Sequence, residues 1–181
     1  MIGNITNSNT INDWFYLVPA VIFIDFIVIV LSKYPGEEPY FKVNALNDWY
    51  DKFGLAAVGS DVLSILIGIM VTRYIYTSLS LKNPLYFIGI LFLFQLFHDI
   101  IFYLFVILPI PSGHNQMIDV FKSYAEENGA KVLVADSLMM IGATAVGSLL
   151  KTLPGHYTVA LNFVTLYSLF YIIYTRTPIT V

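Results

Sequence analysis

The chain has 181 residues, of which 57% are hydrophobic and only 12% are charged, and its formal net charge is −3. A soluble globular domain carries about 25% charged residues, so this composition predicts an integral membrane protein. The nine Lys and Arg residues form no cluster, which argues against nucleic acid as a partner. Cysteine is absent, which excludes disulfides, thiolate catalysis and cysteine zinc sites.

Five apolar segments along the chain have close to the roughly 20 residues that a bilayer-spanning helix needs. They are Trp14–Ser32, Leu55–Tyr76, Leu85–Ile110, Val132–Leu150 and Tyr157–Tyr174. No small-residue cleavage site follows the first segment, so we expect a retained membrane helix rather than a signal peptide. The predicted fold class is all-α: a polytopic membrane protein with about five transmembrane helices, forming a single membrane domain over residues 1–181.

Two segments between these spans are amphipathic. In FKVNALNDWYDKF (41–53) and NQMIDVFKSYAEEN (115–128), apolar residues recur at helical spacing against polar ones. We expect both to be interfacial helices. Because they are acidic rather than basic, packing under the bundle or against a protein partner is favoured over attraction to anionic lipid.

Several landmarks recur at a fixed offset, which suggests an internal duplication. The offset is 74 residues for Asp25/Asp99 and Pro35/Pro109, and 75 residues for Gly54/Gly129 and Asp61/Asp136. The pattern predicts tandem helical hairpins at residues 14–76 and 85–150, followed by an extra helix at 157–174. A chance match of landmarks is the alternative.

The distribution of basic residues predicts the orientation in the membrane. With five spans, one side carries Lys33, Lys42, Lys52, Lys122, Lys131 and Arg176, and the other carries Arg73, Lys82 and Lys151. The positive-inside rule then predicts that the C-terminus and the long loops after the first and third spans lie in the cytoplasm.

Four aspartates fall inside the predicted spans: Asp25, Asp61, Asp99 and Asp136. At 1.5 Å per helical residue, all four lie about 10–15 Å from the same face of the membrane. Gln95 and His98 accompany Asp99 on the third span. The sequence therefore predicts a polar layer near one end of the bundle, and charged side chains within a membrane are costly unless they are paired or protonated.

Two interpretations of this layer remain open. In the first, the carboxylates and His98 form a proton relay or bind a hard cation such as Ca²⁺ or Mg²⁺. In the second, each aspartate hydrogen-bonds a nearby group, such as a tyrosine hydroxyl, His98, a helix N-terminus, or the side chains of Ser60, Ser64 and Ser137.

Catalysis has little support in the sequence. The three histidines are scattered and form no H-E-x-x-H motif, and G-x-S-x-G is absent. His98 and Asp99 are adjacent in a helix, so we expect their side chains to diverge by about 100° and to make a poor acid–base pair. We expect no enzyme activity, no cofactor and no metal.

Three stretches, NDWYDKFGLAAVGSD (47–61), FQLFHDIIFYLF (94–105) and MIDVFKSYAEENGAKVLVADSLMMI (117–141), resemble short multipass membrane proteins of large nucleocytoplasmic DNA viruses. The resemblance implies a structural protein of the virion, such as a minor capsid or membrane-anchor protein. It also implies capsid or other virion membrane proteins as partners, and the virion inner membrane and internal, ER-derived host membranes as the location. No residue role is carried over from it.

Overall fold

The computed structural model describes residues 3–33 and 44–175, which form seven α-helices and no strand. A 3-10 turn, η1 (Ile11–Asp13), precedes the first helix, and a π-helical turn, η2 (Tyr103–Ile107), extends the fourth. The helices are α1 (Trp14–Lys33), α2 (Asn44–Phe53), α3 (Leu55–Ser78), α4 (Pro84–Phe102), α5 (Gln116–Asn128), α6 (Lys131–Leu150) and α7 (Gly155–Ile172). The beginning of the expected amphipathic segment 41–53 lies outside the described residues.

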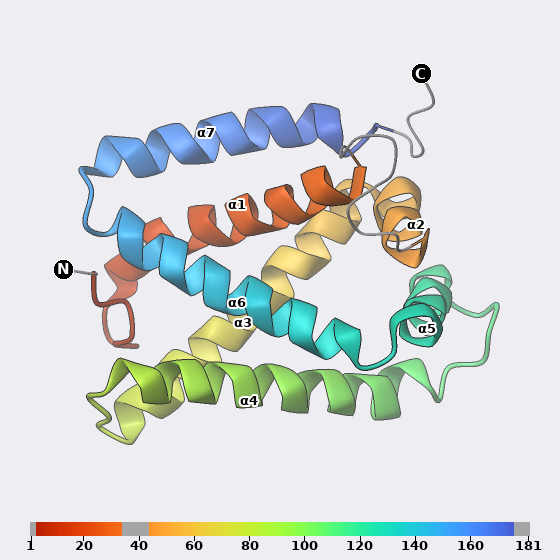
Figure 1. The fold of residues 1–181 in the computed structure, drawn as a ribbon, viewed down its shortest axis with the longest axis horizontal. Coiled ribbons are helices and arrows are strands. Elements are labelled where there is room, and N and C mark those ends of the chain that lie inside the picture. The colour runs from red at the N-terminus through yellow and green to blue at the C-terminus, as the bar shows by residue number, and fades with distance from the viewer. Residues whose placement is uncertain (1–2, 34–43, 176–181) are drawn as a thin grey trace.

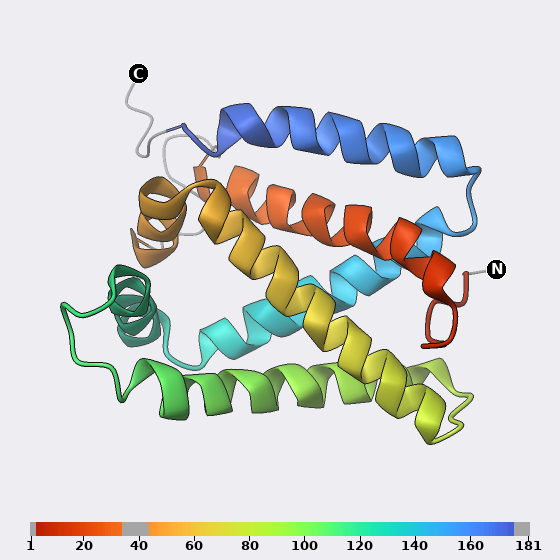
Figure 2. The same cartoon turned by 180° about the vertical axis from the view of Figure 1, so that it is seen from behind.

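The long helices run alternately in opposite directions across the molecule (Figure 1). α3 and α6 cross each other on opposite faces, and they are flanked by α1 on one side and α4 on the other, as the reverse view in Figure 2 shows. α7 lies along the outer side of α1. The result is an all-α bundle, as the sequence predicts.

The most extensive helix–helix contact, between α1 and α6, is made where small residues let the two backbones approach. A Cβ atom added at Gly147 of α6 would lie 3.0 Å from Leu17 Cδ2 and 3.6 Å from Ala20 Cβ of α1. Met140 and Ala143, which precede Gly147 on the same stripe of α6, are fully buried. The face of α6 that carries Met140, Ala143 and Gly147 therefore forms an interface between helices rather than a binding surface.

The two short helices α2 and α5 lie side by side across one end of the bundle, while the N-terminal segment lies at the other end (Figures 1 and 2). Their ends are fixed by polar contacts. Asn115 caps α5 by accepting from the backbone N–H groups of Met117 and Ile118 at 2.9 and 3.2 Å. The Glu127 carboxylate of α5 accepts from the first two N–H groups of α2, both at 3.0 Å, which compensates the positive end of that helix.

The two predicted hairpins have the same order of elements: long helix, short helix, long helix. The turn into the last helix of each is also the same, because Gly54 has φ 52° and ψ −124°, and Gly129 has φ 54° and ψ −135°. This backbone conformation is open to glycine and strained for other residues. The equivalence of Gly54 and Gly129 agrees with the 75-residue offset, while common descent of the two halves stays a prediction.

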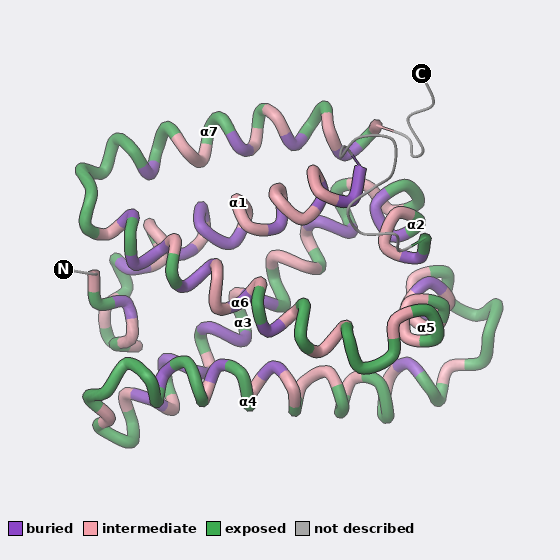
Figure 3. Tube along the Cα trace, viewed as in Figure 1, coloured by how far each residue is buried: buried purple, intermediate pink, exposed green. Residues whose placement is uncertain are grey.

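Within residues 3–33 and 44–175, four helical segments are long and apolar enough to span a membrane: Ile11–Lys33, Leu55–Ser78, Pro84–Ile107 and Lys131–Leu150. Their outward faces are apolar and exposed, most of all on the Pro84–Ile107 segment, where only 17% of the most apolar window is buried (Figure 3). Apolar surface on this scale marks contact with lipid rather than water. The chain is thus a polytopic membrane protein.

The predicted fifth span differs from the other four. α7 is helical, but His156, Asn162 and several hydroxyl side chains lower its mean hydropathy, and it is not among the four candidate spans. Its 18 residues measure about 27 Å. That α7 crosses the membrane stays a prediction.

Candidate functional site

The four aspartates lie at the end of the bundle that α2 and α5 cover. α2 turns Trp49 and Tyr50 inward, 4% and 1% exposed, and leaves Asp48 and Lys52 outside. The Trp49 ring packs against Phe121 of α5, with 4.7 Å between ring centroids. The amphipathic pattern thus brings two aromatic polar groups of α2 directly onto the predicted polar layer.

Asp25 of α1 and Asp61 of α3 meet at the hydroxyl of Tyr50. Tyr50 Oη lies 3.3 Å from Asp25 Oδ1 and 3.2 Å from Asp61 Oδ2. Trp49 Nε1 donates to the same Asp61 Oδ2 at 3.0 Å. Asp25 is fully buried, and its Oδ2 has no hydrogen-bond partner in the described part of the chain. α2 is therefore held on the bundle through the two carboxyl groups.

Burial raises the pKa of the Tyr50 phenol well above its ordinary value, and the neighbouring charges of Asp25 and Asp61 raise it further. The phenol consequently stays protonated and can donate a hydrogen bond throughout the physiological pH range.

Asp99 of α4 is bound by residues of its own helix. Gln95 Nε2 donates to Asp99 Oδ1 at 2.7 Å, and His98 Nδ1 lies 3.1 Å from the same oxygen. The expectation that His98 and Asp99 diverge is wrong, because the two side chains bend toward each other over one carboxylate oxygen. The His98 ring also stacks between Phe94 and Phe102, at centroid distances of 6.2 and 5.9 Å.

Tyr124 of α5 connects the remaining aspartates electrostatically. Burial raises the pKa of its phenol above the ordinary value, and the charges of Asp136, Asp61, Glu127 and Asp99 raise it further. The Tyr124 phenol is thus within electrostatic range of three of the four intramembrane aspartates. Asp136, on α6, is half-buried at this position.

Tyr50 and Tyr124 are 74 residues apart, the offset that also relates Asp25 to Asp99. Each half of the chain therefore supplies one tyrosine from its short helix and two aspartates from its long helices. In the first half, the Tyr50 hydroxyl contacts both carboxyl groups. In the second half, Asp99 instead contacts Gln95 and His98 of its own helix. A tyrosine hydroxyl was expected as an aspartate partner, but neither Tyr50 nor Tyr124 was identified, although the 74-residue offset between them was available as a signal.

The side chains proposed as aspartate partners are right in part. The Tyr50 hydroxyl and His98 contact aspartate carboxyl groups, but the serine hydroxyls do not. Ser60, Ser64 and Ser137 donate instead to carbonyl oxygens of their own helices, at 2.9, 2.9 and 2.7 Å. Among the described residues, no group of three or more His, Asp or Glu side chains is placed to hold a metal ion.

A second polar cluster, at the opposite end of the bundle, was not foreseen. Asp13, 1% exposed, accepts from Arg73 Nη2 at 3.0 Å and from Lys151 Nζ at 2.6 Å. Arg73 Nη2 also donates to the carbonyl oxygens of Asn7 and Thr10, at 2.5 and 3.0 Å. The N-terminal segment is thereby tied to α3 and α6. An arginine inside a predicted span, where an unpaired charge is costly, was the available signal.

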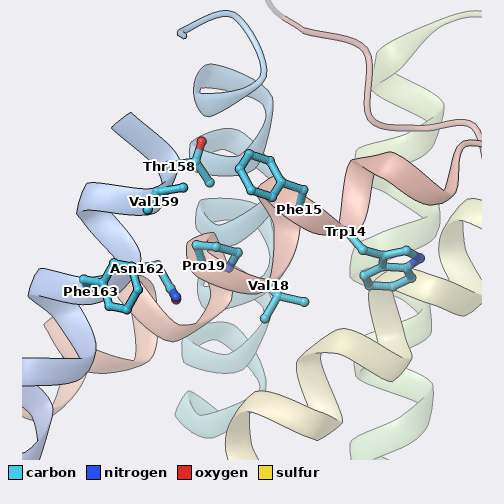
Figure 4. Close-up of a pocket in the computed structure, with 8 residues that line it drawn as sticks. All are labelled: Trp14, Phe15, Val18, Pro19, Thr158, Val159, Asn162 and Phe163. Carbon is cyan, nitrogen blue, oxygen red and sulfur yellow. The ribbon is translucent and has the colours of Figure 1, made fainter. Parts of the chain in front are cut away.

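A surface hollow of about 490 Å³ lies between α1 and α7 (Figure 4). Its lining is apolar except for Thr158 and Asn162, and it has no ionisable side chain: Trp14, Phe15, Val18, Pro19, Thr158, Val159, Asn162 and Phe163. Its lining thus contains no acidic or basic side chain.

Comparison with known proteins gives no match: no protein-family model, no curated protein and no solved structure is significantly similar to this chain.

Proposed function

We propose that this protein is a structural component of a membrane, with the α2–α5 layer as its surface toward partner proteins. The observation that carries the proposal is that the intramembrane aspartates bind side chains of a short helix at the end of the bundle. Asp25 and Asp61 hold Tyr50 and Trp49 of α2 by hydrogen bonds. α2 is in turn bound to α5, because the Glu127 carboxylate accepts from the first two N–H groups of α2.

A transmembrane path for protons or cations, the alternative that the sequence leaves open, has weaker support. Buried apolar side chains, including Ile65, Ile69, Leu91 and Met140, lie between the aspartate layer and the Asp13 cluster. The described residues place the intramembrane aspartates at one end only, so they form no chain of carboxylates from one end to the other.

The outer face of the α2–α5 layer supports a role in protein contact. Asp48, Asp51, Glu126 and Glu127 are exposed there, and Lys52 is the exposed basic residue of α2. An acidic surface is poorly suited to anionic lipid headgroups. The partner that fits it is a basic surface of another protein bordering the membrane. The resemblance noted in the sequence implies capsid or other virion membrane proteins as that partner.

Site-specific photo-crosslinking in native membranes tests this proposal. A photoreactive residue at Glu126 should yield discrete protein adducts, whereas the matched control at Phe163, which is 68% exposed on the apolar face of α7, should react with lipid. Equal adduct patterns at the two positions would contradict the proposal. The virion assignment requires the protein to be present in purified particles, and its absence there would refute that assignment.

Liposomes test the alternative. Purified protein reconstituted with a pH-sensitive dye inside should show no proton flux above that of empty vesicles. Flux that is present in the wild type and lost in both Asp61→Asn and Asp136→Asn would replace the structural proposal with the channel.

A further inference from the structure

The two hydrogen bonds that join Tyr50 to Asp25 and Asp61 need two hydrogens. Two ionised carboxylates and one phenol supply only one. A phenol has a single hydrogen, yet Tyr50 Oη lies within 3.3 Å of an oxygen of each aspartate. If both carboxyl groups were ionised, they would have to share that hydrogen, and Asp25 Oδ2 would still lack any donor.

Among the residues that the structure describes, no cation compensates such a pair of charges. Within the described residues, Lys33, Lys52, Arg73 and Lys151 pair with other acids, and none of these ion pairs includes Asp25 or Asp61. An ionised carboxylate without a cation or a full set of donors costs several kcal/mol in a buried, apolar setting. One additional proton on the pair supplies the missing hydrogen and leaves one negative charge instead of two.

The surroundings of the two carboxyl groups identify which one carries the proton. Asp61 Oδ2 accepts from Trp49 Nε1 at 3.0 Å, and hydrogen-bond donors favour an ionised carboxylate. Asp25 is fully buried, and among the described residues its one side-chain hydrogen-bond contact is with the Tyr50 hydroxyl at 3.3 Å, longer than either contact of Asp61 Oδ2. The consistent arrangement has Asp25 Oδ1–H donating to Tyr50 Oη, and Tyr50 Oη–H and Trp49 Nε1–H both donating to Asp61 Oδ2.

We infer that Asp25 is a proton-binding site and that Asp25, Tyr50 and Asp61 form a proton relay under α2. Transfer along the relay conserves charge. The Asp25 proton passes to Tyr50 Oη as the phenol hydrogen passes to Asp61 Oδ2, so Asp25 becomes ionised and Asp61 neutral. The relay connects a fully buried acid to one that is half-buried, and it goes beyond a purely structural use of these residues.

The relay also couples proton binding to the docking of α2, because Tyr50 and Trp49 are the α2 side chains that it holds. Loss of the shared proton leaves two carboxylates opposite one hydroxyl. The other ionisable groups that face Asp61 are Tyr124 of α5 and Asp136 of α6, and neither supplies a positive charge to replace the proton.

Infrared spectroscopy of the full chain in nanodiscs at neutral pH tests the inference. The spectrum of the wild type minus that of Asp25→Asn should contain the C=O band of a protonated carboxyl group, while the band should persist in Asp61→Asn. The matched control, Asp48→Asn, removes an exposed acid paired with Lys52 at 2.7 Å and should remove only carboxylate absorption. A difference spectrum for Asp25→Asn that resembles the control would overturn the inference, as would loss of the band in Asp61→Asn alone.

A second variant keeps the test decisive if Asp25→Asn fails to fold. Tyr50→Phe retains Asp25 but deletes the oxygen that accepts its hydrogen bond, so the carboxyl C=O band should move to higher frequency. An unchanged band would show that Asp25 does not donate to Tyr50. Trp49 fluorescence, measured in a Trp14→Phe background, confirms in each variant that α2 remains in place.

Discussion

Replacing Asp13 by alanine should destabilise the protein more than the loss of any exposed acid, because it leaves a buried guanidinium without its counterion. The Arg73 and Asp13 side chains are each 1% exposed and lie 3.0 Å apart. Breaking a buried ion pair by removing one partner costs about 3–5 kcal/mol. Lys151 also loses its 2.6 Å contact with Asp13, although its side chain is 28% exposed and can be hydrated.

The control for this prediction is Asp48→Ala. Asp48 and Lys52 form a pair at 2.7 Å with side chains 55% and 54% exposed, and a surface pair of this kind contributes less than about 1 kcal/mol. The double variant Asp13→Ala/Arg73→Met removes the uncompensated charge as well, so it should recover part of the lost stability.

Equilibrium unfolding in detergent micelles measures these differences. Trp14 serves as a local reporter in a Trp49→Phe background, since its ring lies 5.2 Å from the Arg73 guanidinium carbon. If Asp13→Ala lowers the free energy of unfolding no more than Asp48→Ala does, the Asp13 cluster does not anchor the N-terminal segment. Failure of the double variant to recover stability would show that the lost charge is not the cause.

Three further predictions follow from the packing and capping of the helices. The raised Tyr50 pKa contributes stability that is complete below the unfolded pKa of about 10 and is lost as pH rises above it, at about 1.4 kcal/mol per pH unit. Tyr50→Phe should therefore reduce, by that slope, the alkaline decline of the free energy of unfolding. An identical decline in the variant and the wild type would contradict this prediction. Glu127→Gln loses at least one of two hydrogen bonds to the α2 N-terminus and should cost about 1 kcal/mol, seen as faster amide exchange in α2. Gly147→Val forces a side chain against Leu17 and should cost about 1–3 kcal/mol, whereas Gly59→Ala, with nothing within 4 Å of the new Cβ, should be neutral or stabilising; equal effects in thermal unfolding would refute the packing argument.

The helices themselves could be predicted from sequence because hydrophobicity and helical periodicity are local properties. The first span was expected at Trp14–Ser32 and is found at Trp14–Lys33, and the fourth was expected at Val132–Leu150 and is found at Lys131–Leu150. The third was expected to reach Ile110, and a π-helical turn carries it to Ile107. The shared depth of the aspartates followed from the same counting of residues per turn.

The partners of those aspartates were decided by tertiary structure alone. A position in sequence determines the depth of a side chain in a helix bundle, but the rotation and crossing of neighbouring helices determine which side chain it meets. Asp13 contacts Arg73 from 60 residues away and Lys151 from 138 residues away. Asp25 and Asp61 are linked through α2, because the Tyr50 hydroxyl contacts both carboxyl groups. The sequence by itself thus determined where charge enters the membrane, and only the folded bundle decided how that charge is held, because hydrogen bonds between helices depend on a packing geometry that no local pattern encodes.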